Sequence, residues 1–484
     1  MIALTLAEVA AATGGTVRDA DPATPVTSLS VDSRTSQPGG LFVALPGSRT
    51  DGARHAGDAL AAGAAACMAR PGAAAGGPRV EVADPLTALA AVAGEVRARS
   101  GARVVGVTGS VGKTTTKDLL AAVLATRFET VATRASFNNE VGLPLTLARL
   151  EPSTEALVAE MGARGPGHIA MLARLARPGV GVVLNVAEAH LGVFGSRRAI
   201  AEAKGELVEA LPPEGVAVLN GDDPLVAAMA GRTAARVVTF GLGPGAAVRA
   251  EGIELDAEGR ARFRLATGDG CADVALPAMG EHLVADALAA AAAAGALGMP
   301  PDEVAAGLRG ARLSPARMQV TRRADGLTVV NDAYNANPTS MAAGLKALAA
   351  AGRAGGRTVA VLGEMAELGD SAAEEHDRIG RLVARLGIDR LIGVGELGRV
   401  MVQAARMEGM WPEEALAAAD ADAALAVLAS GVGPGDVVLV KASRVIALDR
   451  VADRLLAAGE GPGEAGEPGE AVPARGGTAP GGEG

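Results

Sequence analysis

The sequence predicts an α/β protein of three domains, in which a small N-terminal α/β domain precedes two larger domains with parallel sheets. The chain has 484 residues, which suits two to four domains of ordinary size. Strand patterns alternate with helical patterns in two separate series, and that rhythm is typical of βαβ units. Hydrophobic residues make up 49% of the chain, which is enough for large buried cores.

The N-terminal domain is expected to span residues 1–83. The first 15 residues read as a small amphipathic helix, because Glu8 interrupts an apolar stretch that lacks the basic region of a signal peptide. Short strands and turns follow in VTSLSVDSR, GGLFVALPG and GAAACMA. We place the end of this domain at the Asp84-Pro85 dipeptide.

The central domain is expected to span residues 84–313. A helical pattern over 86–99 leads into the strand ARVVGV, and four further strands alternate with helices: ALVAEMG, VGVVLNV, VAVLN and VVTFG. This order predicts a parallel sheet. Residues 246–277 alternate polar and apolar and predict a small antiparallel insertion, after which a helix over 282–297 closes the domain.

The C-terminal domain is expected to span residues 314–458 and to be Rossmann-like. Its strands are LTVVND, TVAVLGE, LIGVG and DVVLVKA, with helices between them. From residue 459 to 484 the chain is rich in Gly, Pro, Glu and Ala without periodicity, so we expect a disordered tail.

Composition excludes several classes of protein. Aromatic residues are only 2% of the chain and the net charge is −10, which argues against a nucleic-acid or membrane-surface binder. Two cysteines, Cys67 and Cys271, cannot build a disulfide framework or a cysteine-based zinc site. No segment reaches the ~18 uninterrupted apolar residues of a membrane span. We therefore expect a cytoplasmic monomer without membrane insertion.

The strongest chemical signal is GVTGSVGKTTTKDLL, residues 106–120. A strand, a Gly-rich turn and a helix present free backbone N–H groups to an anion. Lys113 adds a cation for phosphates, and the Thr114 hydroxyl suits Mg²⁺. The strict spacing fails because Val107 replaces the first glycine, and a plain Gly-rich turn is the alternative. The motif predicts a P-loop ATPase domain whose nucleotide contacts are Gly109, Ser110, Val111, Gly112, Lys113, Thr114 and Thr115.

Two further side chains are candidate metal ligands. Glu160 ends the strand ALVAE, and His190 follows the strand VVLNV. Ligands collect at the carboxyl ends of parallel strands, so we expect Thr114, Glu160 and His190 to hold Mg²⁺. Taken singly, Glu160 could be a solvated loop carboxylate and His190 a hydrogen-bonded structural histidine.

Several separated motifs resemble the Mur ligase family of ATP-dependent amide-bond ligases. In order they are TGSVGKTTT, SFNNEVGLP, EMGARGPGHI, NVAEAHLGVFGS, AKGEL and NGDDP, then NDAYNANPTSM, VLGEMAELG and VKASR. The last three point to the branch that adds D-alanyl-D-alanine to UDP-N-acetylmuramoyl-tripeptide. The resemblance implies ATP and Mg²⁺ as cofactors and an acyl-phosphate intermediate in peptidoglycan precursor synthesis.

The resemblance also implies residue roles. Lys113, His190 and Lys204 would be catalytic, and in several Mur ligases the lysine matching Lys204 is carbamylated. The remaining nucleotide contacts would be Asn139, Arg317, Asp332 and Asn335. The substrate-binding residues would be Ser30, Asp32, Ser33 and Arg34, which match the uridine-nucleotide region, together with Asn138.

Some alternatives stay open at this point. Lys204 could be a solvated helix lysine, and Asn335 could serve turn chemistry before Pro338. Leu283 and Asp286 replace two asparagines that the family usually carries, which puts a nucleotide-side contact in question. The runners-up in function are the sibling ligases, folylpolyglutamate synthase, and a nucleotide-dependent binding protein or silent scaffold.

Overall fold

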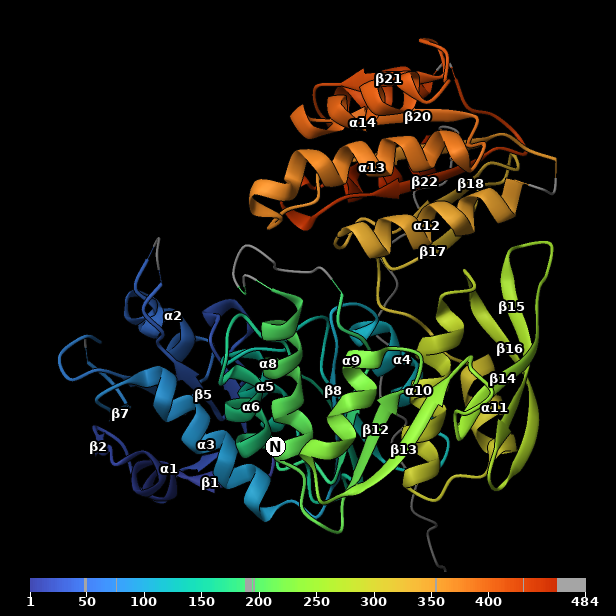
Figure 1. The fold of residues 1–484 in the computed structure, drawn as a ribbon. Coiled ribbons are helices and arrows are strands. Elements are labelled where there is room, and N and C mark those ends of the chain that lie inside the picture. The colour runs from blue at the N-terminus through green and yellow to red at the C-terminus, as the bar shows by residue number, and fades with distance from the viewer. Residues whose placement is uncertain are drawn as a thin grey trace, which may run out of the picture.

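A computed structural model describes residues 1–47, 50–74, 76–187, 194, 196–352, 355–429 and 431–458. Its strands form three separate larger sheets, and Figure 1 shows the C-terminal domain stacked on the central one, with the N-terminal domain to the side. The expected boundaries at 83/84 and 313/314 fall between these sheets. The expected tail, 459–484, lies outside the described residues.

The N-terminal sheet has five strands in the order β2-β7-β6-β5-β4, and only β2 is antiparallel to its neighbour. The predicted first helix is present as α1 (Leu6–Thr13), where Thr5 and Glu8 form a capping box. A short pair, β1 (Leu4–Thr5) and β3 (Pro25–Val26), flanks it. The remaining elements are β2 (Thr16–Arg18), β4 (Ser28–Ser30), β5 (Gly40–Val43), α2 (Ala56–Ala61), β6 (Ala66–Ala69) and β7 (Arg79–Glu81).

The central sheet has nine strands in the order β16-β15-β14-β13-β12-β11-β8-β10-β9. The five predicted strands, β8, β10, β11, β12 and β13, pair in parallel. Two further parallel pairings were not predicted, that of the edge strand β9 with β10 and that of β14 with β13. The antiparallel strands expected over 246–277 are present as β14, β15 and β16, and they extend this same sheet because Phe240 and Gly241 of β13 pair with Val248 and Arg249 of β14. The strands are β8 (Arg103–Thr108), β9 (Thr130–Ala132), β10 (Ala156–Glu160), β11 (Val180–Val183), β12 (Val216–Asn220), β13 (Arg236–Gly241), β14 (Val248–Leu255), β15 (Arg260–Thr267) and β16 (Gly270–Met279).

Helices cover both faces of the central sheet and bury two apolar cores. One core takes in α3, α5, α6 and α8, and the other takes in α4, α10 and α11. Helix α10 is buried along most of its length through alanines, whose small side chains let helix and sheet approach closely in a chain with few aromatics. The helices are α3 (Pro85–Arg99), α4 (Lys113–Leu124), α5 (Gly142–Leu147), α6 (His168–Ala176), α8 (Arg197–Glu209), α9 (Pro224–Ala227), α10 (Leu283–Ala296) and α11 (Pro301–Arg309).

The C-terminal sheet has six strands in the order β17-β18-β22-β19-β20-β21, with only β17 antiparallel. All four predicted strands are present, as β18 (Thr328–Asn331), β19 (Thr358–Leu362), β20 (Arg390–Val394) and β22 (Val437–Lys441). The edge strands β17 (Gln319–Arg322) and β21 (Ala415–Ala418) were not predicted, because β17 is mostly polar and exposed and β21 is mainly alanine. Helices α12 (Pro338–Ala351), α13 (Ala372–Arg385) and α14 (Glu396–Met407) cover one face, and α15 (Ala421–Ala429) and α16 (Asp449–Ala457) the other.

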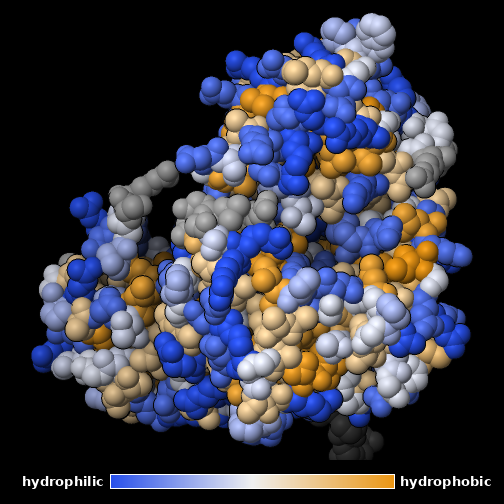
Figure 2. All heavy atoms as spheres, viewed as in Figure 1, coloured by the Kyte–Doolittle hydropathy of each residue, from blue (hydrophilic) through white to orange (hydrophobic). Residues whose placement is uncertain are grey.

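The surface is polar over much of the C-terminal domain, with apolar side chains scattered among the charged ones (Figure 2). No helix in the described part of the chain is long and apolar enough to cross a membrane.

Candidate active site

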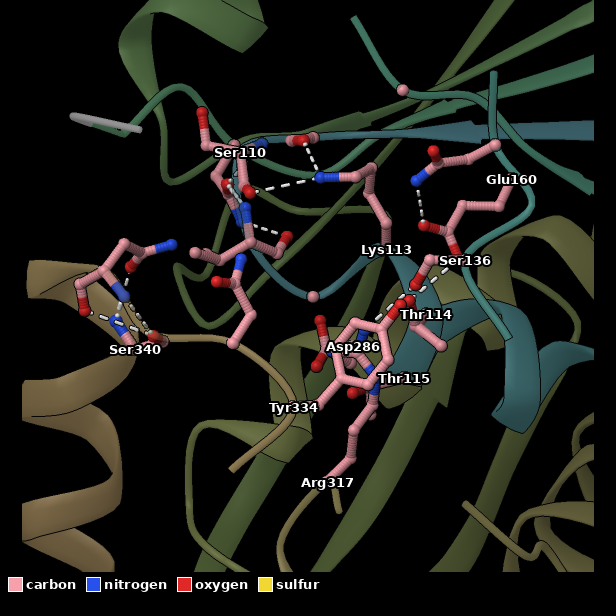
Figure 3. Close-up of a pocket in the computed structure, with 18 of the residues that line it drawn as sticks. Ser110, Lys113, Thr114, Thr115, Ser136, Glu160, Asp286, Arg317, Tyr334 and Ser340 are labelled. Atoms are coloured by element: carbon pink, nitrogen blue, oxygen red, sulfur yellow. Dashed lines mark hydrogen bonds between the residues drawn. The ribbon is translucent and has the colours of Figure 1, made fainter. Parts of the chain in front are cut away.

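A cleft of about 500 Å³ lies where the central and C-terminal domains meet. Strand order places it, because β10 and β11 flank β8 and all three end at the same edge of the sheet. Figure 3 shows Lys113 and Glu160 of the central domain and Arg317 and Tyr334 of the C-terminal segment around this cavity. All seven nucleotide contacts predicted over residues 109–115 line the cleft.

The Gly-rich turn needs its glycines for conformation and for space. Gly112 has φ +83° at the start of α4, and a Cβ there would lie 2.2 Å from Oδ1 of Asp286. A Cβ on Gly109 would lie 2.8 Å from Leu184. The Nζ atom of Lys113 donates to the carbonyls of Gly109 (2.7 Å) and Ser110 (3.2 Å), so the lysine folds over its own loop.

Asn185 holds the turn from the neighbouring strand end. Its Oδ1 accepts the backbone N–H groups of Ser110 (3.1 Å) and Val111 (2.9 Å), and its Nδ2 donates to the Val111 carbonyl (3.1 Å). Sequence reasoning did not assign this residue a role. Its position directly after a buried strand, at the edge that carries the P-loop, was the available signal.

Thr114 and Glu160 form a close oxygen pair beside the turn. The Thr114 hydroxyl donates to Oε2 of Glu160 (2.8 Å), and Asn138 Nδ2 donates to Oε1 (2.7 Å). Glu160 is fully buried, so it is not a solvated loop carboxylate. A hydroxyl and a carboxylate are hard oxygen donors of the kind Mg²⁺ prefers, with phosphates and water completing the shell.

The third predicted metal ligand, His190, lies outside the described residues. Among the residues that are described, no group of three or more His, Cys, Asp or Glu side chains could hold a metal by itself. The structure therefore brings together two of the three predicted ligands, Thr114 and Glu160.

Lys204 reaches the cleft from α8 and is only 6% exposed, so it is not a solvated surface lysine. Burial lowers its pKa well below the ordinary value, and the nearby Lys113 ammonium lowers it further. Within the described residues its Nζ makes no hydrogen bond. A Cβ on the adjacent Gly205 would lie 2.1 Å from the Arg232 guanidinium, so a larger residue there would displace this arginine side chain.

Three of the predicted nucleotide contacts come from the C-terminal domain and line the cleft, namely Arg317, Asp332 and Asn335. Arg317 lies over the Tyr334 ring, 4.3 Å from its centroid, and donates weakly to the Ser136 hydroxyl (3.4 Å). Its buried Nε has no hydrogen-bond partner among the described residues. Asp332 pairs with the buried Lys441 (2.6 Å), a partner that the sequence did not predict.

Asn139, Asn335 and Asn337 all line the cleft, and two of them, Asn139 and Asn337, also hold a turn or a helix end with their side chains. Asn335 lines the cleft, and its carbonyl accepts from Lys441 Nζ (3.0 Å). Asn337 caps α12 by accepting from Ser340 N (2.9 Å). Asn139 lines the cleft, but its Oδ1 accepts from Gly142 N (2.8 Å) and so closes the turn before α5.

Asp286 is an acid buried against the P-loop. It accepts from the Thr116 hydroxyl (3.2 Å) and lines the cleft beside Gly112. Burial raises its pKa from 3.8 to about 7, while Thr116 and Arg317 oppose the rise. Asp286 was noted in the sequence only as a departure from the family pattern.

The predicted uridine-nucleotide residues lie apart from this cleft, in the N-terminal domain. Asp32 pairs with Arg34 (2.6 Å) and caps the short 3₁₀ helix η1 (Ser33–Thr35). Its hydrogen bonds with Arg34 lower the pKa of Asp32 to about 2. The Ser30 hydroxyl lies 2.9 Å from that of Ser36. None of Ser30, Asp32, Ser33 and Arg34 lines the interdomain cleft.

Comparison with known proteins agrees with this architecture domain by domain. Residues 25–97 match the family model described as Mur ligase family, catalytic domain. Residues 107–294 match the Mur ligase middle domain, and residues 316–444 match the Mur ligase, glutamate ligase domain.

Two curated relatives and two solved structures show the extent of the similarity. A UDP-N-acetylmuramoyl-tripeptide--D-alanyl-D-alanine ligase of Mycobacterium tuberculosis is 48% identical, covering 94% of this chain and 98% of its own. One of Bacillus subtilis is 34% identical, covering 94% and 99%. A crystal structure of MurF from Acinetobacter baumannii has a TM-score of 0.85 at 32% identity, covering 94% and 99%. The MurF ligase of Thermotoga maritima in complex with ADP has a TM-score of 0.78 at 30% identity, covering 90% and 98%. The chain belongs to the Mur ligase family.

Proposed function

We propose that this chain is an ATP-dependent ligase that joins D-alanyl-D-alanine to UDP-N-acetylmuramoyl-tripeptide in peptidoglycan precursor synthesis. The observation that carries the proposal is the shared cleft, in which the P-loop, the Thr114–Glu160 pair and Lys204 face Arg317 and Asp332 of the C-terminal domain. The relatives that carry this activity match the chain over nearly its whole length.

The chemistry requires activation of a poor electrophile. The terminal carboxylate of the tripeptide attacks the γ-phosphorus of ATP, which gives an acyl phosphate and ADP. The amine of D-alanyl-D-alanine then attacks the acyl carbon, and phosphate leaves with the C–O bond electrons. Negative charge gathers on phosphate oxygens in both steps, so Lys113 and the N–H groups that open α4 stabilise it.

The Thr114 hydroxyl and the Glu160 carboxylate would hold Mg²⁺, and His190 would add a ligand. Bound Mg²⁺ supplies positive charge that offsets the phosphates. Asn138 orients the Glu160 carboxylate by donating to its second oxygen. Lys204 stands in the same cleft, where burial favours its neutral form. A neutral amine can react with CO₂, and the resulting carbamate would present carboxylate-like oxygens toward the metal.

The C-terminal domain would contact ATP, and the N-terminal domain would hold the UDP end of the UDP-tripeptide. The buried Nε of Arg317, which has no hydrogen-bond partner in the part of the chain that the structure describes, would donate to a phosphate oxygen, and Asp332 would accept from ribose hydroxyls. The exposed Arg34 guanidinium of the N-terminal domain would meet the UDP diphosphate.

A phosphate-release assay tests the proposal. Purified enzyme receives ATP, Mg²⁺, UDP-N-acetylmuramoyl-tripeptide and D-alanyl-D-alanine, and each component is omitted in turn. We expect release to require all four, with an ADP-forming stoichiometry of one phosphate per dipeptide joined. Release that does not depend on the dipeptide would overturn the substrate assignment in favour of a sibling ligase.

The matched variants are Lys113→Ala and Lys346→Ala. Lys113 faces the cleft, whereas Lys346 is exposed on α12. We expect Lys113→Ala to abolish phosphate release in a folded protein and Lys346→Ala to leave it unchanged. Normal turnover by folded Lys113→Ala would contradict the P-loop role.

A further inference from the structure

Two adjacent residues of the P-loop helix, Lys117 and Asp118, form an ion pair of unusual geometry. Lys117 Nζ lies 2.7 Å from Asp118 Oδ1, and the lysine side chain is only 3% exposed. Neighbouring residues on a helix do not ordinarily face each other. Neither residue touches the P-loop cleft directly, so the proposed reaction does not yet assign the pair a role.

Lys117 fixes a loop that carries cleft residues. Its ammonium donates to the carbonyls of Thr133 (2.9 Å) and Ala135 (3.5 Å), in addition to the ion pair with Asp118. The buried charge is thus surrounded by one carboxylate and two carbonyls. Removing one partner of a buried charge is costly, because the charge is left uncompensated away from water.

The loop that Lys117 holds is strained and leads to both sides of the nucleotide site. Ala135 has φ +47°, a left-handed conformation that costs a non-glycine residue free energy unless its surroundings enforce it. The next residue, Ser136, accepts from Arg317 (3.4 Å), and Asn138 donates to Glu160 (2.7 Å). The lysine thus holds a loop that contacts both Arg317, a proposed nucleotide residue, and Glu160, a proposed metal ligand.

Asp118 holds the other wall of the cleft. Its second oxygen, Oδ2, accepts the backbone N–H of Ser314 (2.7 Å). Ser314 lies in the segment that connects α11 to the C-terminal sheet, three residues before Arg317. One carboxylate thus joins the P-loop helix to the point where the chain enters the C-terminal domain.

We propose that the Lys117–Asp118 pair is a positioning device that keeps both walls of the ATP cleft in register with the P-loop. This proposal rests on the proposed function, and it assigns a different role to each of the two residues. The Lys117 side sets nucleotide and metal affinity through the loop 133–138, and the Asp118 side sets turnover by fixing where the C-terminal domain starts.

Four variants separate the two roles. Lys117→Met removes the loop anchor. Asp118→Asn breaks the ion pair but keeps an oxygen that can accept from Ser314, whereas Asp118→Ala removes both bonds. Ser314→Pro deletes the N–H that Asp118 accepts and also fixes φ at that position, while it leaves the Lys117–Asp118 ion pair in place. Because Ser314 is only partly buried, this variant remains available if a buried variant does not fold. The matched control is Lys346→Met, an exposed lysine on α12.

The assay measures kcat and KM for ATP and for the UDP-tripeptide, together with ADP affinity by a binding titration that needs no turnover. We expect Lys117→Met and Asp118→Asn to raise KM for ATP and the dissociation constant of ADP about tenfold, with KM for the UDP-tripeptide within about twofold. Asp118→Ala should in addition lower kcat about tenfold, whereas Ser314→Pro should lower kcat about tenfold and keep the KM for ATP within about twofold. The control should match the wild type.

A merely structural pair would give another pattern, in which thermal stability falls while KM for ATP stays constant. Unchanged ATP and ADP constants in folded Lys117→Met would overturn the loop role. Equal kcat values for Asp118→Asn, Asp118→Ala and Ser314→Pro would overturn the linker role. Failure of the proposed function can be told apart from failure of the pair's role. If the proposed function is wrong, wild-type enzyme releases no dipeptide-dependent phosphate. The ADP titration does not depend on that reaction, so it still tests the pair.

Discussion

Replacing Asp286 with asparagine should stabilise the protein at neutral and alkaline pH and leave it unchanged in acid. The Asp286 carboxyl is buried beside Gly112, and burial raises its pKa from 3.8 to about 7. The folded state therefore binds this proton more tightly than the unfolded state does. Stability from the protonated form is complete below pH 3.8 and is lost as the pH rises toward about 7.

The size of the effect follows from the two pKa values. At about pH 8 the buried carboxylate costs the folded state about 4 kcal/mol relative to the acid form, and about half of that cost develops between about pH 5.5 and pH 8. Asparagine is always neutral and keeps an oxygen for the Thr116 hydroxyl, which now lies 3.2 Å from Asp286. For a domain of 150–250 residues, the roughly 2 kcal/mol that develops between about pH 5.5 and pH 8 corresponds to a change of roughly 4–8 °C in the melting-temperature difference between variant and wild type.

The assay is thermal unfolding followed by far-UV circular dichroism at a series of pH values from about 4 to 8. The melting temperature of Asp286→Asn minus that of the wild type should be near zero in acid and should grow with pH. The control is Asp269→Asn, an exposed aspartate in the turn between β15 and β16, which should run parallel to the wild type. Parallel curves for Asp286→Asn and wild type would refute the buried-acid reasoning.

Three other substitutions bear on the proposed reaction. Glu160→Gln should raise the Mg²⁺ concentration for half-maximal rate about tenfold, because it removes the charge that faces Thr114; an unchanged Mg²⁺ titration would argue against a metal role. Asp332→Asn should weaken ATP binding more than UDP-substrate binding in separate titrations, and equal losses would contradict the division between domains. Lys204→Ala should be nearly inactive in a phosphate-release assay, with partial recovery in small carboxylic acids if a carbamate is the active form. An inactive variant without recovery would favour the unmodified amine, and full activity would remove Lys204 from the mechanism.

Much of the fold could be predicted because its signals are local. Each strand of the parallel cores is a short apolar run, and the turn between β8 and α4 carries its glycines and lysine in sequence order. What the sequence left open falls where pairing decides the outcome. The antiparallel pattern from Ala246 onward is visible in the sequence, but its place in the central sheet depends on the pairing of Phe240 and Gly241 with Val248 and Arg249. The edge strands β17 and β21 lack the buried β-branched run that marks β18, since β17 is mostly exposed and β21 is mainly alanine.

Only part of the candidate site could be predicted from local sequence patterns. The P-loop residues and Glu160 were predictable because strand ends collect on one sheet edge. The uridine-nucleotide residues rest on family resemblance alone, since Asp32 and Arg34 by themselves form only a charged turn. The nucleotide contact of Asn139 also rests on the resemblance; the residue lines the cleft, and its Oδ1 accepts from Gly142 N.

The groups that sequence reasoning missed share one property, which is a partner far away in the chain. Asp286 accepts from Thr116 across 170 positions, and Asp118 accepts from Ser314 across 196. Each is an acid that would count as an ordinary surface carboxylate in its own helix pattern. Burial changes that, because a charge removed from water must find a partner or a proton. Asp118 has found a partner in Lys117, and Asp286 holds its proton more tightly. The first acid is thus stabilised as a charged pair and the second as a protonated acid. Asp118 lies on the helix that begins at Lys113, and Asp286 contacts that helix through Thr116.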